Sequence, residues 1–195
     1  MNFKNIYTTL KKNAANILLV GFAVMLLLVP GTKSWVLQQL VSVGLFKASI
    51  DKEKVNAIPL EKSNFSYTGA AGNTANTANL KGKVVFINFW ASWCPPCQAE
   101  MPSLQGLYNK LKDDNRFVFI FINEDEDKEK ATTYLKKNNY SFPIYSTAGP
   151  VPNEIYSGSL PTTIVLNKDG KIVLKKEGMA GYDTEAFIQQ LKDLL

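Results

Sequence analysis

The sequence contains no histidine and only two cysteines among its 195 residues. Without histidine, neither a Ser-His-Asp triad nor a Cys-His catalytic pair can be assembled. Histidine-ligated zinc and copper sites are excluded for the same reason. These absences direct attention to the cysteines, Cys94 and Cys97, which stand three positions apart.

Acidic residues are absent from the first part of the chain. Residues 1–50 hold five lysines and no Asp or Glu, which accounts for the whole formal net charge of +5. Subtracting these five from the 22 basic residues leaves 17 in residues 51–195, where they are balanced by all 17 acidic ones. A nucleic-acid footprint should lie on the folded part of a protein. The charge distribution therefore argues against nucleic acid as a partner.

Only one long apolar run is present. Residues 14–30 carry no charge, follow three lysines, and have a length at the short end of what spans a bilayer as a helix. A cleaved signal peptide has a similar basic start and apolar core, but residues 29–34 offer no clear A-x-A cleavage site. We expect an uncleaved transmembrane anchor with residues 1–13 in the cytoplasm. Both interpretations place the rest of the chain outside the cytoplasm.

Residues 31–62 are predicted to lie between the anchor and the domain. Within them, 35–46 spaces its apolar residues about one helical turn apart. Such a helix can lie at the outer membrane surface, with Trp35 at headgroup level, or it can pack on the domain or on a partner. The residues leave these two interpretations open. Residues 47–62 are polar and charged and indicate a linker.

From residue 63 the pattern becomes that of an α/β domain, 63–195. Short apolar runs rich in β-branched and aromatic residues indicate strands buried on both faces, and amphipathic stretches between them predict helices. This order predicts an α/β sandwich around a mixed β-sheet. The expected elements are a short strand, polar loop and turn in 63–83, strands at 84–90, 117–122, 142–146, 162–167 and 171–178, and helices at 98–114, 123–139 and 183–195.

The two cysteines stand between the first buried strand and its helix, in 89-FWASWCPPCQAEMPSL-104. A structural disulfide that closes so small a loop removes little chain entropy. A zinc clip needs two further ligands from carboxylates or from a partner chain. A redox couple at the start of a helix places its first sulfur beside unpaired N–H groups and the positive end of the helix dipole, which stabilise a thiolate. The pattern favours the redox couple.

Trp93-Cys94-Pro95-Pro96-Cys97 at a strand-to-helix junction, together with the later Leu160-Pro161-Thr162-Thr163, resembles the thioredoxin superfamily. Over residues 81–104 the chain is similar to the TlpA/ResA/DsbE-like group, the membrane-anchored, extracytoplasmic thiol–disulfide oxidoreductases of bacteria. The resemblance covers about 63–195 and implies a thioredoxin-like sandwich behind an N-terminal transmembrane helix. We expect no cofactor and no metal.

The resemblance implies a role for each residue around the pair. Cys94 is expected to attack the substrate disulfide, and Cys97, deeper in the helix, to resolve the mixed disulfide. Pro95 and Pro96 offer no donor to a thiolate, so we expect a reducing couple that donates electrons. Glu100 is expected to handle protons, because Cys97 must lose its proton before it attacks. In isolation, a glutamate on the helix surface fits the same pattern.

Other positions are assigned by the resemblance alone. Asn88 stands where cytoplasmic thioredoxins carry a buried Asp, which leaves Glu100 as the candidate for proton transfer. Pro161 matches the superfamily's cis-proline facing the disulfide, and the backbone of Leu160 is expected to pair with an extended substrate. Trp93 is expected to shield the sulfur and to line the docking surface.

Two polar segments have less specific explanations. The acidic run 124–127 is interpreted as N-cap and first-turn charges of a helix. Residues 146–159, rich in Gly, Ser and Pro, are expected to form a loop beside the active site.

Together these residues predict a single-pass protein of the bacterial cytoplasmic membrane whose catalytic domain faces the periplasm or the outside. Such a protein reduces protein disulfides and is recharged by a transmembrane thiol carrier, and apocytochrome c is a client type in the family. An oxidase or isomerase of secreted proteins is an alternative within the same chemistry. A non-catalytic thioredoxin-like adaptor, whose disulfide never cycles, is an alternative from a different class.

Overall fold

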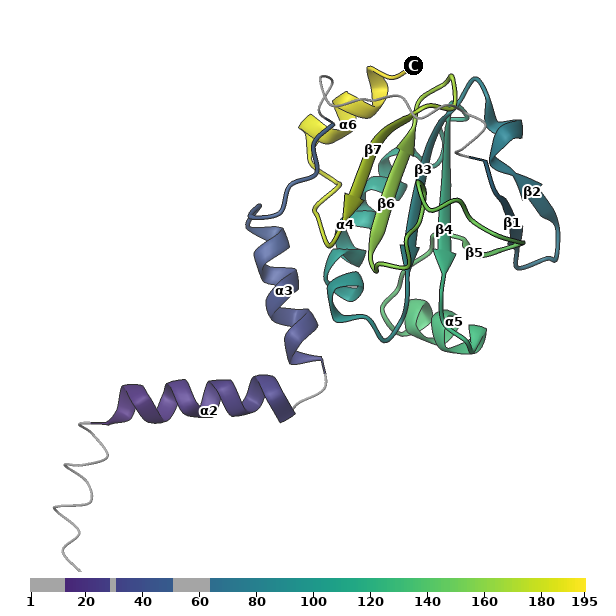
Figure 1. Cartoon of the computed structure of the whole chain (residues 1–195). Helices are drawn as coiled ribbons and strands as arrows, with labels where there is room; N and C mark the ends of the chain where they lie inside the picture. The colour runs from purple at the N-terminus through teal and green to yellow at the C-terminus, as the bar shows by residue number, and fades with distance from the viewer. Residues whose placement is uncertain (1–12, 29–30, 51–63) are drawn as a thin grey trace, which may run out of the picture.

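A computed structural model describes residues 13–28, 31–50 and 64–195 of the chain (Figure 1). Nearly all of the expected cytoplasmic segment 1–13 and most of the expected linker 47–62 lie outside these residues. The helices are α2 (Ala14–Leu28), α3 (Thr32–Ser42), α4 (Pro95–Leu111), α5 (Lys128–Lys137), α6 (Glu185–Lys192) and the short 3-10 helix η2 (Thr77–Leu80). The strands are β1 (Ser66–Gly69), β2 (Thr74–Asn76), β3 (Val84–Trp90), β4 (Phe117–Asn123), β5 (Ile144–Thr147), β6 (Thr162–Leu166) and β7 (Ile172–Glu177).

The described strands form one seven-stranded sheet in the order β2-β1-β5-β4-β3-β6-β7. β3 lies near its centre, parallel to β4 and antiparallel to β6. The outer pairs β6–β7, β1–β5 and β1–β2 are antiparallel. The predicted mixed sheet is therefore confirmed, and β3 carries the chain from the middle of that sheet directly into the cysteine motif.

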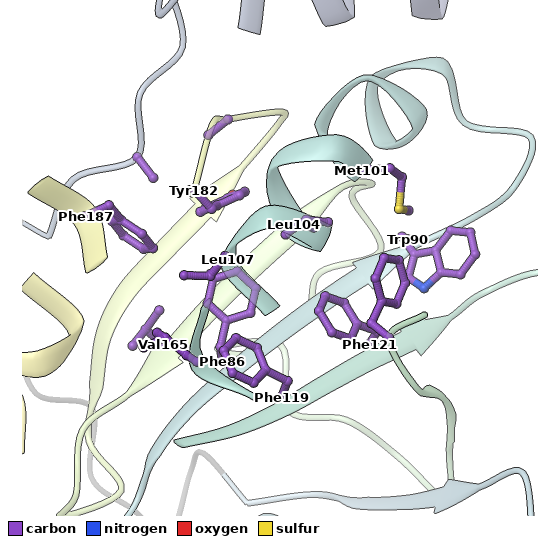
Figure 2. Packing of buried hydrophobic residues seen from close by; sticks show 14 of the residues in the cluster. Phe86, Trp90, Met101, Leu104, Leu107, Phe119, Phe121, Val165, Tyr182 and Phe187 are labelled. Carbon is purple, nitrogen blue, oxygen red and sulfur yellow. The ribbon is translucent and has the colours of Figure 1, made fainter. Parts of the chain in front are cut away.

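Both faces of the central strands are covered, which explains their continuous apolar sequence. Alternate residues of β3 point to opposite faces: Phe86 and Trp90 join the cluster under α4, α5 and α6, whereas Ile87 and Phe89 join a second cluster on the other face. Figure 2 shows the first cluster, in which α4 places Met101, Leu104 and Leu107 over phenylalanines of β3 and β4. This packing fixes α4, and with it the cysteines, against the sheet.

The structure departs from the predicted boundaries in a few places. α4 begins at Pro95 rather than at residue 98, because proline suits the first turn of a helix, where its missing N–H costs nothing. α5 begins only at Lys128, with Asp127 as its N-cap. The polar loop expected within 63–83 contains β2 and η2, whose small polar residues carry little local signal.

The segment before residue 63 packs against the domain, in agreement with one of the two interpretations left open for 35–46. α3 packs against α4, with Val41 buried in the contact, while Trp35 stays exposed. The expected linker is wrong at its start, because Ala48 and Ile50 are buried in the main core cluster and Ile50 N–H donates to Gln190 Oε1 of α6 at 2.9 Å. Domain packing therefore begins well before residue 63.

α2 covers most of the expected anchor 14–30 and exposes apolar side chains such as Leu18 and Phe22. Across residues 13–28, 31–50 and 64–195, none of the helices combines the length and apolar character that crossing a bilayer requires.

Candidate active site

The cysteine pair lies at the N-terminus of α4 and is joined by a disulfide, with the two Cα atoms 5.2 Å apart. Cys94 is the N-cap residue, and its Sγ accepts the N–H of Cys97 at 3.2 Å. Pro95 and Pro96 occupy the first turn and supply no N–H. Cys94 is 4% exposed and Cys97 is fully buried. An attacking sulfur at Cys94 and a sheltered resolving sulfur at Cys97 fit this arrangement.

The loop before Cys94 is held by a buried carboxylate. Both oxygens of Asp125 accept the Ser92 N–H, at 3.0 and 3.2 Å, and Oδ2 also accepts Asn123 Nδ2 at 3.0 Å. Gln98 Nε2 donates to the Ser92 carbonyl at 2.5 Å, which ties the same loop to α4. Asp125 is only 2% exposed. The β4–α5 turn therefore fixes the loop that positions Cys94.

The sequence interpretation of the acidic run missed Asp125. The predicted capping role is confirmed for Asp127, whose side chain accepts the Glu129 N–H at 3.0 Å. Asp125 instead folds back toward the cysteine loop, 33 positions away in sequence. No local pattern distinguishes these two aspartates, because their difference depends on a tertiary contact.

Glu100 is completely buried on α4, so the alternative of a surface glutamate is wrong. Its Oε1 accepts Asn88 Nδ2 of β3 at 2.7 Å, and its Oε2 accepts the Ala180 N–H at 3.3 Å. Burial raises the pKa of Glu100 from an ordinary 4.5 to about 8, and the hydrogen bonds from Asn88 and Ala180 offset part of that rise. Glu100 lies one helical turn after Cys97, so the two share a face of α4.

A polar network extends from Glu100 into β6. Asn88 Nδ2 also donates to Thr163 Oγ1 at 3.0 Å, and the Tyr182 hydroxyl is 2.8 Å from the same oxygen. Burial raises the pKa of Tyr182 well above 10, and the nearby Glu100 raises it further. Asn88 thus contributes a neutral donor, and Glu100 supplies the buried carboxyl of this network.

The Leu160–Pro161 peptide bond is cis. Pro161 directly precedes β6, and Thr162 pairs with Phe89 near the end of β3. The strand pairing therefore places Pro161 at the same end of the sheet from which the chain continues to Cys94. Leu160 packs partly buried against both core clusters. Within the described part of the chain, its backbone N–H and C=O make no hydrogen bond.

The remaining predicted positions flank this end of the sheet. Trp93 is 65% exposed and stands directly before Cys94, whereas Trp90 is buried in the core. The loop that follows β5 packs Tyr156 on Phe89, with ring centroids 4.3 Å apart and planes within 2°. Among the described residues, no three acidic or cysteine side chains gather as a metal site would require.

Comparison with known proteins decides the family. Residues 54–186 match the redoxin family. The chain belongs to this family. Over 139 residues the chain is 38% identical to the thiol-disulfide oxidoreductase ResA of Bacillus cereus. The alignment covers 68% of this chain and 79% of that relative.

Solved structures of similar proteins agree with the fold of the redoxin. A Chlorobium tepidum protein described as a thiol:disulfide interchange protein DsbE aligns with a TM-score of 0.57 at 26% identity, over 75% of this chain and 99% of that chain. StoA from Bacillus subtilis aligns with a TM-score of 0.53 at 27% identity, over 70% of this chain and 98% of that chain. The predicted thioredoxin-like fold is confirmed.

The redoxin is a thiol–disulfide oxidoreductase, as its sequence predicted, and Cys94 and Cys97 fit its dithiol couple. Near that couple lie the buried carboxyl of Glu100 and the backbone of Leu160, which makes no hydrogen bond to the residues that the structure describes. The individual roles of Glu100, Trp93, Leu160 and Pro161 stay predictions.

Proposed function

We propose that this redoxin is a reductase of protein disulfides that works outside the cytoplasm while tethered to a membrane. One observation carries the direction of electron flow. Among the described residues, the Cys97 N–H is the only hydrogen-bond donor to Cys94 Sγ. Strong oxidants stabilise their reduced form through extra interactions with the thiolate. Since Pro95 and Pro96 supply no such donor, the dithiol gives up its electrons more readily.

The reaction transfers two electrons through one mixed disulfide. The Cys94 thiolate attacks one sulfur of the substrate disulfide, forms the mixed disulfide and releases the other substrate sulfur as a thiolate. The Cys97 thiolate then attacks Cys94 Sγ, which closes the Cys94–Cys97 disulfide and releases the second substrate thiolate. The substrate is reduced and the redoxin is oxidised to the disulfide state of the present structure.

Glu100 supplies the base that this second step needs. Cys97 is fully buried, so solvent does not readily remove its proton. With its pKa raised by burial to about 8, Glu100 is ionised in about one molecule in ten at pH 7 and can exchange a proton near neutrality. We assign to Glu100 the acceptance of the Cys97 proton during resolution and its return during recharging.

The backbone N–H and C=O of Leu160, which bond to none of the described residues, support a substrate that binds as an extended peptide. Main-chain groups in this conformation can add a strand-like partner, and the exposed indole of Trp93 offers an apolar contact beside the reactive sulfur. Protein disulfides are therefore the proposed substrates. A transmembrane thiol carrier is the proposed electron donor, and apocytochrome c is proposed as a client on the ResA resemblance alone.

Membrane attachment is proposed from the N-terminal residues. α2 carries exposed apolar side chains and no charge, and three lysines precede it in the sequence. The positive-inside rule keeps those lysines in the cytoplasm and directs the domain outward. Fractionation of cells that express the full chain tests this: we expect it in the membrane pellet after a carbonate wash, and a chain shortened by cleavage in the soluble fraction would contradict the tether.

The reduction potential of the couple tests the reductase assignment. The full chain in mild detergent is equilibrated against defined thiol buffers, and the reduced fraction is counted by alkylation. We expect a value near that of thioredoxin, about −270 mV. A value near about −120 mV would instead favour an oxidase, and a pair that never exchanges would favour a non-catalytic adaptor.

A further inference from the structure

Two residues that follow α3, Phe46 and Ala48, are hydrogen-bonded to the loop that contacts Glu100. Gly181 N–H donates to the Phe46 carbonyl at 2.6 Å, and Ala48 N–H donates to the Gly181 carbonyl at 3.0 Å. Lys47 and Gly181 thereby form an isolated parallel bridge. We refer to residues 46–48 as the clamp. Both of its hydrogen bonds are to Gly181, the residue directly after Ala180.

The clamped loop connects β7 to α6 and reaches the centre of the active site. Its first residue, Gly178, donates its N–H to the Pro161 carbonyl at 2.9 Å. Ala180 is fully buried and donates its N–H to Glu100 Oε2 at 3.3 Å, and its carbonyl lies 3.4 Å from Ser103 Oγ. The same loop therefore contacts both the cis-proline and the buried carboxyl.

The clamp and α3 also lie in close contact with this loop. A Cβ atom on Gly181 would meet Val41 Cγ1 of α3 at 3.4 Å and the Phe46 carbonyl oxygen at 3.5 Å. Ala48 is buried in the main core cluster, which fixes the clamp from its other side. Gly181 is thus enclosed by a segment that lies more than 130 positions earlier in the sequence.

We propose that the clamp is a positioning element of the active site, which holds the Ala180 N–H against the Glu100 carboxylate. The proposal rests on the proton-transfer role proposed above for Glu100. A hydrogen bond to the ionised form of a carboxyl favours ionisation. The clamp therefore makes it easier for Glu100 to reach the charged form in which it accepts the Cys97 proton.

The groups around Glu100 allow its titration to be distinguished from that of its neighbours. Asn88 and Thr163 of the strands carry no charge, and the loop itself contributes Tyr182, whose pKa burial raises well above 10. On its own helix, the reduced Cys97 is the titratable neighbour one turn away. A pH-dependent step that disappears in Glu100→Gln is therefore assigned to Glu100.

The test follows the reduction of a cystine-containing peptide by the full chain, in mild detergent, from pH 5 to 10. Ala48→Pro removes the N–H that donates to Gly181, and we expect the Glu100-dependent inflection to move up by about 0.5 to 1 pH unit. Ser49→Pro is the matched control, because Ser49 is exposed and its N–H makes no hydrogen bond in the described part of the chain. The control should leave the inflection in place.

A second variant keeps the test independent of proline. Gly181→Val retains the N–H and C=O of the loop but forces a branched side chain against Val41 and the Phe46 carbonyl, and it should shift the inflection in the same direction. Near-ultraviolet circular dichroism selects the variants that fold. In a Glu100→Gln background, Ala48→Pro should produce no further change in the profile.

The outcomes separate the clamp from the proposed function. If Glu100→Gln removes the inflection while folded Ala48→Pro or Gly181→Val leaves it unmoved, the clamp has no positioning role and the proton-transfer role of Glu100 stands. If Glu100→Gln leaves the inflection intact, the proposed role of Glu100 fails and the inference fails with it. A shift in Ala48→Pro that Ser49→Pro reproduces would also overturn the clamp.

Discussion

The fold should lose stability as the pH rises, and Glu100 should be the cause. Its carboxyl is completely buried between α4, β3 and the β7–α6 loop. Removal from water disfavours the ionised form, which raises the pKa of Glu100 to about 8, and the donors Asn88 and Ala180 counter only part of that effect. The folded state therefore binds this proton more tightly than the unfolded chain does.

The sign and size of the effect follow from linkage. Because the folded pKa lies above the unfolded value of 4.5, the stabilising contribution is fully present below pH 4.5 and is lost as the pH rises through about 8. At about 1.36 kcal/mol for each pH unit between the two pKa values, the loss is on the order of 5 kcal/mol. A loss of this size is comparable to the whole free energy of unfolding of many domains. Small movements around the ionised carboxylate make the loss smaller.

Glu100→Gln isolates this contribution. Urea unfolding of the oxidised full chain, followed by tryptophan fluorescence at pH 5, 7 and 9, gives the free energy of unfolding of wild type and variant. Gln keeps the shape but presents an amide N–H₂ to the Ala180 N–H, so we expect the variant to be the less stable protein at pH 5. By pH 9 the difference should reverse or vanish, because the wild type alone carries a buried charge.

The matched control is Glu185→Gln on α6, where the exposed carboxylate pairs with Lys110 at 2.6 Å. The free energy of unfolding of this variant should differ little from that of the wild type, and the difference should not change from pH 5 to 9. A difference in free energy of unfolding between wild type and Glu100→Gln that stays constant from pH 5 to 9 would refute the reasoning. It would mean that Glu100 ionises near its ordinary pKa, and the proposed proton transfer at neutral pH would lose its basis.

Two further predictions concern the cysteine motif. Cys97→Ser should accumulate the mixed disulfide with a substrate peptide, visible on a non-reducing gel, whereas Cys94→Ser should form none; the reverse pattern would exchange their roles. Asp125→Ala leaves the Ser92 N–H without its acceptor and should lower the free energy of unfolding by about 1–3 kcal/mol. The exposed neighbour in Glu126→Ala should change that free energy little, and equal effects of the two substitutions would contradict the role given to Asp125.

The elements that could be predicted from the sequence are those with strong local patterns. The all-apolar run of β3 and the repeating apolar positions of α4 indicate a buried strand and an amphipathic helix without reference to the rest of the chain. The cysteine motif itself is local, so its place at the strand-to-helix junction was predicted as well. β2 and η2 were missed because each is three or four residues long and lacks a repeating pattern.

The features that could not be predicted depend on contacts between distant parts of the chain. Asp125 and Asp127 have the same side chain and similar neighbours, yet one caps a helix and the other binds the Ser92 N–H. Residues 47–50 look like a polar linker by composition. Ala48 and Ile50 are nevertheless buried in the core, and they are hydrogen-bonded to Gly181 and Gln190, which no local pattern connects with them.

Glu100 shows how the two kinds of information combine. Its spacing from Cys97 is local, so the sequence already placed a carboxyl on the same side of the helix as the buried sulfur. Its chemistry is not local, because the burial that raises its pKa comes from a sheet before it and a loop some eighty positions after it. A motif of cysteines and prolines thus places the two sulfur atoms, whereas the surrounding fold sets the pKa of the carboxyl beside them.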